Sequence, residues 1–170
     1  RSFSEQRLDQ VIDGAAVAVT SVVVTDAGDV LVAVSYTGEV DFNDTLSVEP
    51  HGGSDIALAA YDGNSSTLVW VVSVGDNLDD VPTSLAIFDG DVLLGGSFSG
   101  IDVDLEPCGT QLFDAVDSDA VVLRWDLDAL PSCSSPALQW ATVLGDTGGD
   151  LTRAVIASGD RIYAAGGTGG

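Results

Sequence analysis

The two cysteines, Cys108 and Cys133, are the residues of this 170-residue chain whose chemistry is most readily specified. Each lies in a segment that lengthens the second of the internal repeats described below, so the two insertions bring one cysteine apiece. This pattern predicts a disulfide that ties the two loops over the outer edge of a sheet. Such a bond stabilises the folded state by about 2–4 kcal/mol. An even cysteine number in an acidic chain also suits an oxidising compartment. The alternatives are two free thiols, or a zinc site that needs more ligands than His51 adds.

Two acidic turns occupy the same place in successive repeats, at residues 76–80 (DNLDD) and 146–150 (DTGGD). Short loops of Asp, Asn and Gly can wrap Ca²⁺, which takes roughly 6 to 8 oxygen ligands. Neither turn has the EF-hand spacing, and Asp is also a common turn former. We therefore predict no cofactor and no metal ligands, and we keep Ca²⁺ binding as the alternative to plain solvated turns.

Residues that would support catalysis are few. His51 is the only histidine, and no Gly-x-Ser-x-Gly turn accompanies it to build a nucleophilic site. The glycine-rich residues 166–170 lack the lysine of a phosphate-binding loop. Trp70, Trp125 and Trp140 recur at equivalent strand positions, which favours packing over ligand stacking. Nothing selects a carboxylate pair for glycoside hydrolysis among the 27 acidic residues, so we predict no catalytic residues and no enzyme.

Charge and hydropathy narrow the possible partners. Five Lys and Arg oppose 27 Asp and Glu, and the net charge of −22 repels phosphate backbones and anionic head groups. We expect no nucleic-acid binding and no attachment to a membrane surface. No apolar run approaches the length of about 18 residues that predicts a membrane span. Because the chain begins with Arg1, we also expect it to be processed or taken from a longer protein.

The elements that must position these residues are β-strands, because one hairpin pattern is written three times. Two apolar runs flank a tight turn in residues 81–100, and the same design recurs at residues 21–38 and 153–169. Asp-Gly between apolar runs indicates a two-residue hairpin turn. Tryptophan strands at residues 68–74 and 139–144 repeat with a similar spacing. A period of about 60 to 70 residues built from short strands is typical of a propeller.

We therefore predict an all-β fold, a β-propeller of four-stranded antiparallel blades, with about two and a half blades in this chain. Each blade is expected to open with the tryptophan strand, followed by the hairpin and a fourth strand. Residues 1–170 then form a partial propeller, with blade one at about 1–62, blade two at about 68–127 and an incomplete blade three at about 138–170. The predicted strands cover residues 21–25, 30–36, 56–61, 68–74, 83–88, 92–98, 120–125, 139–144, 154–157 and 162–165. Their continuous apolar runs predict strands that are buried on both faces.

Several short motifs resemble the bacterial β-propeller repeat known as SBBP. Residues 35–42 (SYTGEVDF) open the match, and Ser54-Asp55-Ile56-Ala57 with Tyr61-Asp62 continues it. Further matches come at Trp70, Gly75, Asp80, Gly90–Val92 and Gly95, and the second copy runs from Ser118 through Trp140, Gly145 and Asp150 to Gly166. Ala60 and Arg124 stand where the repeat usually has lysine. The resemblance implies a propeller and a surface setting, and it supplies no catalytic residue.

The leading functional hypothesis is a non-enzymatic β-propeller scaffold, an adhesion or protein-interaction module, secreted or on the bacterial cell surface. One alternative is a Ca²⁺-dependent module that binds glycan or protein. Another is a propeller enzyme whose site lies in blades outside this chain. Since propellers close with roughly 4 to 8 blades, the expected partners are the remaining blades or other copies of the chain, with a protein or glycan ligand possible.

Overall fold

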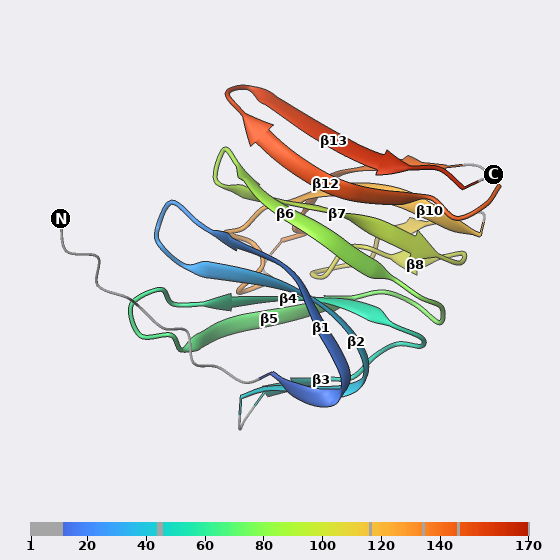
Figure 1. Cartoon of the computed structure of the whole chain (residues 1–170). Coiled ribbons are helices and arrows are strands. Elements are labelled where there is room, and N and C mark those ends of the chain that lie inside the picture. The colour runs from blue at the N-terminus through green and yellow to red at the C-terminus, as the bar shows by residue number, and fades with distance from the viewer. Residues whose placement is uncertain (1–11, 44–45, 116, 134, 146, 170) are drawn as a thin grey trace.

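The computed structural model describes residues 12–43, 46–115, 117–133, 135–145 and 147–169 (Figure 1). Within these ranges the regular elements are all β-strands, so the predicted all-β class is confirmed. The abundance of β-branched residues and turn-forming glycines explains the preference for strands. No helix in the described part of the chain is long and apolar enough to cross a bilayer.

Two larger antiparallel sheets share one strand order. The first sheet runs β1-β2-β4-β5, with the short β3 paired to β2, and the second runs β6-β7-β10-β11. Strands of the first sheet are Asp13–Val24 (β1), Val30–Asn43 (β2), Leu46–Val48 (β3), Asp55–Tyr61 (β4) and Leu68–Val74 (β5). Strands of the second are Val81–Phe88 (β6), Asp91–Ser99 (β7), Ser118–Trp125 (β10) and Leu138–Leu144 (β11). In each sheet a hairpin comes first, and two more strands are added beyond its second strand.

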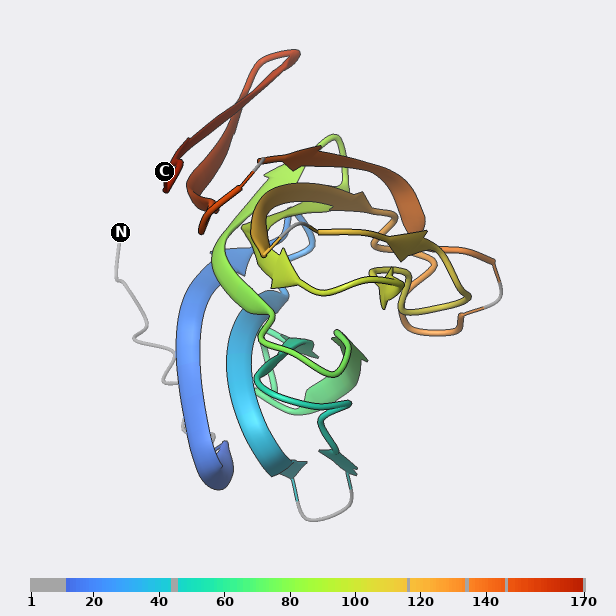
Figure 2. The same ribbon diagram turned by 90° about the vertical axis from the view of Figure 1, so that its right-hand side faces the viewer.

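The third sheet is a hairpin of β12 (Leu151–Ser158) and β13 (Arg161–Gly167). A fourth, very small sheet pairs β8 (Val103–Asp104) with β9 (Leu112–Phe113) in the long connection between β7 and β10. Figure 2 shows the hairpin in red at one end, on the far side of the second sheet from the first.

The tryptophan strands belong to different sheets from those expected. The repeat pattern predicts that residues 68–74 open the second unit, whereas β5 hydrogen-bonds to β4 and completes the first sheet. Likewise β11 pairs with β10 in the second sheet. The cause is local, because β4 and β5 are joined by a tight turn in which Asp62 Oδ1 accepts the backbone N–H groups of Asn64 and Ser65 (2.9 and 2.7 Å). Strands joined by such a short turn become antiparallel neighbours. In blade one the repeat pattern predicts the equivalent of the tryptophan strand within residues 2–16, and residues 2–11 lie outside the described ranges.

The hairpin turns confirm the reading of the Asp-Gly steps. Phe88 pairs with Asp91 across two turn residues, Asp89 and Gly90, with φ of 53° and 84°. Two consecutive positive φ values define the turn that matches the twist of the flanking strands. Arg161 pairs with Ser158 across a second two-residue turn, in which Gly159 has φ of 61°.

The first strand of each sheet carries the same irregularity. β1, β6 and β12 each shift register, at Val19/Ser21, Pro82/Ser84 and Thr152/Ala154, and β1 has a second shift at Gly14/Ala16. Beside the shift, Ser21 Oγ accepts the backbone N–H of Leu85 at 2.9 Å. Ser84 Oγ accepts the backbone N–H of Val155 at 3.1 Å. One type of hydrogen bond therefore joins β1 to β6 and β6 to β12.

The sheets pack face to face, with β6 between β1 and β12 (Figures 1 and 2). The main core lies between the first and second sheets and includes Leu58, Leu94 and Trp125. A smaller cluster around Leu93 and Val155 joins the second and third sheets. All seven residues of β4 are buried, as the continuous apolar run predicts. Trp70 and Trp125 lie in the main core and Trp140 packs against the smaller cluster, so the three tryptophans are packing residues.

Candidate functional site

The predicted cysteine pair is present at disulfide distance. Cys108, between β8 and β9, is joined to Cys133, between β10 and β11, with their Cα atoms 4.7 Å apart. The bond closes a loop of sequence separation 25 and ties the two enlarged connections of the second sheet together. Trp125 supports the same region, since its Nε1 donates to the carbonyl of Leu105 at 3.0 Å.

A buried glutamate beneath the disulfide fixes these loops and is absent from the sequence predictions. Glu106 is 4% exposed. Its Oε1 accepts the backbone N–H groups of Cys108 (2.8 Å) and Ala137 (2.9 Å), and its Oε2 accepts that of Leu138 (2.6 Å). Charge-assisted bonds of this kind are about twice as strong as neutral ones. Glu106 therefore holds the β7–β10 connection against the start of β11.

The first acidic turn uses its carboxylates to bind its own backbone and its neighbours. Asp76 Oδ1 accepts the N–H of Leu78 at 2.8 Å, and Asp79 Oδ1 accepts that of Ser54 at 2.9 Å. Asp80 accepts the N–H groups of Asp76 (3.0 Å) and Ser99 (3.2 Å). These contacts are those of a structural turn. In the second turn Asp146 lies outside the described residues.

The carboxylates at the ends of the two turns each meet another buried carboxylate across a glycine. A Cβ placed on Gly75 would clash with Asp55 Oδ1 and come within 2.8 Å of Asp80 Oδ2. A Cβ on Gly145 would clash in the same way with Asp119 Oδ1 and Asp150 Oδ2. The four carboxylates are almost fully inaccessible: Asp55 0%, Asp80 0%, Asp119 5% and Asp150 1% exposed. The hydrogen bonds repeat too, because Asp150 Oδ1 accepts the N–H of Gly169 at 3.2 Å as Asp80 Oδ1 accepts that of Ser99.

Burial controls the protonation of the first pair. Burial raises the pKa of Asp80 to about 7, against the lowering effect of its two backbone donors and with help from the charges of Asp76 and Asp55. Burial also raises the pKa of Asp55, while the backbone N–H and the imidazole of His51 lower it. His51 Nδ1 lies 3.3 Å from Asp55 Oδ2. Asp55 Oδ1 has no hydrogen-bond partner within the described structure.

His51 and the carboxylates of the first acidic turn, which are candidates for catalysis and metal binding, make structural contacts in the described residues. Within the described ranges no three Asp, Glu, His or Cys side chains are grouped to hold a metal ion. His51 is 57% exposed and contacts a carboxylate rather than a serine or cysteine. The repeated Asp–Gly–Asp arrangement was detectable in part, because Asp55 and Asp119 occupy equivalent positions in the sequence repeat.

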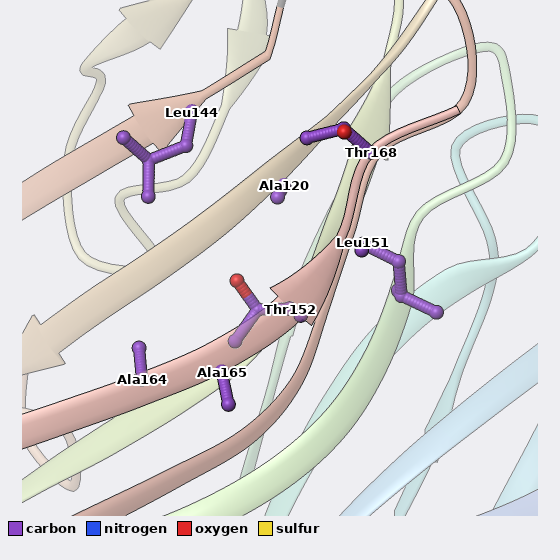
Figure 3. Close-up of a pocket in the computed structure, with 9 residues that line it drawn as sticks. Ala120, Leu144, Leu151, Thr152, Ala164, Ala165 and Thr168 are labelled. Carbon is purple, nitrogen blue, oxygen red and sulfur yellow. The ribbon is translucent and has the colours of Figure 1, made fainter. Parts of the chain in front are cut away.

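A surface hollow of about 430 Å³ lies beside β13 (Figure 3). Leu144 and Ala120 of the second sheet stand on one side of it, and Ala164 and Ala165 of β13 on the other. Gly166 and Gly167 continue the lining along β13. Leu144 is 55% exposed, so the hollow has an apolar wall that faces solvent. In the described part of the chain no strand pairs with the edge of β13 that faces away from β12.

Comparison with models of known protein families and with curated proteins found no match to this chain. The resemblance to the SBBP repeat therefore depends on the short motifs in the sequence. In the structure these motifs bring Asp55, Gly75 and Asp80 of the first copy together. They do the same for Asp119, Gly145 and Asp150 of the second copy.

Proposed function

We propose that this chain is a non-enzymatic scaffold that binds other polypeptides, in a secreted protein or on the cell surface. The observation that carries this proposal is the apolar hollow beside the open edge of β13. Open sheet edges combined with exposed apolar side chains are typical of sites that accept another chain. Exposed Ile156 and Tyr163 extend the apolar surface of the same hairpin.

We also propose that the three sheets are successive blades of a β-propeller. Three observations support this arrangement: the shared strand order, the face-to-face packing, and the repeated serine bond that joins β1 to β6 and β6 to β12. The first strands lie next to one another in sequence order, as the inner strands of a propeller do. In such an array the binding surfaces belong to loops and open edges, since the sheet faces are occupied by packing.

An extracellular setting is supported by two features. The pairing of Cys108 with Cys133 suits an oxidising compartment, where disulfides persist. The net charge of −22 keeps such a protein soluble and repels anionic surfaces.

A Ca²⁺-dependent binding module is the second candidate, and the converging carboxylates of Asp55 and Asp80 are the observation that favours it. Titration calorimetry with CaCl₂ separates the two candidates. The scaffold proposal expects no heat of binding and an unchanged melting temperature. A saturable heat that is lost in Asp80→Asn would favour the calcium-dependent module.

Selection from a displayed peptide library tests the scaffold proposal itself. The immobilised chain should enrich extended apolar sequences over a surface that carries an unrelated acidic protein. No enrichment after several rounds would contradict a role in polypeptide binding. The acidic control is required because a charge of −22 attracts basic peptides without a site.

A further inference from the structure

We propose that the open edge of β13 binds one antiparallel β-strand that is apolar in its centre and acidic near its C-terminal end. This inference rests on the proposed polypeptide-binding function and names the site and the chemistry of the partner. The partner is an extended segment of about the length of β4 or β10, which have 7 and 8 residues.

The first step is that β13 is equivalent to β2 and β7, whose corresponding edges are covered. β4 pairs antiparallel with β2, and β10 pairs antiparallel with β7. β13 matches β7 residue by residue: a Cβ on Gly96 would meet the carbonyl of Val81, and a Cβ on Gly166 would meet that of Leu151. The edge of β13 therefore has the conformation that accepts a strand in the other two sheets, and strand addition is an established mode of peptide binding.

The second step is that the hollow lies where such a strand would run. It extends along residues 164–167 of β13 to Thr168 and is walled by Ala120 of β10 and Leu144 of β11. β10 lies in this place relative to β7, and its centre, Ala120–Leu123, is buried between sheets. The lining residues of β13 are alanine and glycine, which leave room for the side chains of an added strand (Figure 3).

The third step concerns charge and gives the site its preference. In the second sheet Arg124 of β10 pairs with Asp91 at the start of β7, with Nη2 and Oδ2 2.6 Å apart. Arg161 occupies the position of Asp91 in β13, since each follows its two-residue turn directly. Arg161 is 73% exposed. A strand added to β13 would place near Arg161 the residue that corresponds to Arg124 of β10. An acidic side chain at this position is attracted to Arg161, and an arginine is repelled.

Two labelled peptides test the proposal on the intact chain. One has the sequence of residues 117–126, DSDAVVLRWD, and the other carries glutamate at the position of Arg124, DSDAVVLEWD. Fluorescence anisotropy at about 0.15 M salt, where the long-range repulsion from the net charge of −22 is largely screened, should show tighter binding of the glutamate peptide by about two-fold. Hydrogen exchange should slow at the amides of Arg161–Gly167 in the complex. A peptide with proline at the position of Val122 should not bind, because proline interrupts the ladder.

Matched variants locate the site. Gly167→Phe fills the hollow, and a Cβ at Gly167 meets nothing within 4 Å, so the fold accepts it. We expect at least ten-fold weaker binding in this variant. Ile101→Gln, at an exposed position between β7 and β8 that does not line the hollow, should bind as the parent does.

Several outcomes would overturn the inference. Equal binding by Gly167→Phe, tighter binding of the arginine peptide, or protection of amides away from β13 would each contradict it, while leaving polypeptide binding as a function intact. A mass of twice 17.3 kDa by light scattering, with β13 protected in the absence of peptide, would assign the edge to a second copy instead. No binding of either peptide together with no enrichment from the library would remove both the inference and the proposed function.

Discussion

Replacement of Asp80 by asparagine should flatten the pH dependence of stability. Asp80 is fully buried, and its pKa is raised from 3.8 to about 7, chiefly by burial. The folded state therefore binds the proton more tightly than the unfolded state. The stabilisation that this group provides is complete below about pH 3.8 and is lost as the pH rises through about 7. Between about pH 5 and pH 8.5 the loss amounts to roughly 2–3 kcal/mol.

Asparagine removes this titration and keeps the shape of the side chain. It also removes the negative charge that Asp80 carries near Asp55 at high pH. It loses one acceptor, however, so one of the N–H groups of Asp76 and Ser99 is less well satisfied. We expect Asp80→Asn to be within about 1 kcal/mol of the parent at pH 5 and more stable than the parent at pH 8.5.

Urea unfolding at a series of pH values measures this difference as the free energy of unfolding. The matched control is Asp79→Asn, which removes a charge from the adjacent, exposed residue of the same turn. Because Asp80 is intact in this variant, its stability should keep the parent's dependence on pH. Parallel curves for Asp80→Asn and the parent would refute the assignment of a buried, proton-binding carboxylate at Asp80.

Three further predictions concern the loops and the repeated glycine. Replacing both Cys108 and Cys133 by serine should lower the free energy of unfolding by about 3 kcal/mol, from the loop that the bond closes; labelling of the unreduced parent with a thiol reagent should give no product, and stoichiometric labelling would contradict the bond. Glu106→Gln should lower the free energy of unfolding by about 1–3 kcal/mol, since an amide NH₂ replaces one of the oxygens that accept backbone N–H groups. Urea unfolding measures this free energy, and an unchanged midpoint would contradict the role of Glu106 in holding the loops. Gly145→Ala should lower the free energy of unfolding by more than about 2 kcal/mol, because the new Cβ collides with the carboxylates of Asp119 and Asp150. In the control Gly149→Ala the new Cβ meets no atom within 4 Å, so the free energy of unfolding should change by less than about 1 kcal/mol. Equal shifts in melting temperature for the two variants would contradict the packed carboxylate pair.

Local chemistry explains what could be predicted from the sequence. Asp89 and Gly90 specify the hairpin turn by themselves, since few residues accept two consecutive positive φ values. The cysteine pair was predictable because both insertions stood out against the first repeat. The continuous apolar run of β4 indicated burial on both faces, and all of its residues are buried.

The features that could not be predicted from the sequence depend on how distant segments of the chain are arranged. The sheet to which β5 belongs is decided by the tight turn at Asp62, which the spacing of repeats does not reveal. The meeting of Asp55 with Asp80 depends on where the connection after β5 crosses from one sheet to the next. Glu106 lies in a connection that is longer than its counterpart in the first repeat, and comparison between the repeats did not single it out.

Hydrogen exchange of the chain alone tests most directly whether β13 offers an open edge. β7 is paired on both sides, by β6 and β10, so successive amides of Asp91–Ser99 should all exchange slowly. β13 is paired by β12 alone within the described structure. In Arg161–Gly167 the amides that point toward β12 should therefore exchange slowly. The alternate amides, which point toward the open edge, should exchange quickly. Uniform protection of β13 at the level of β7 would show that the edge is already covered, and would contradict the proposed binding site.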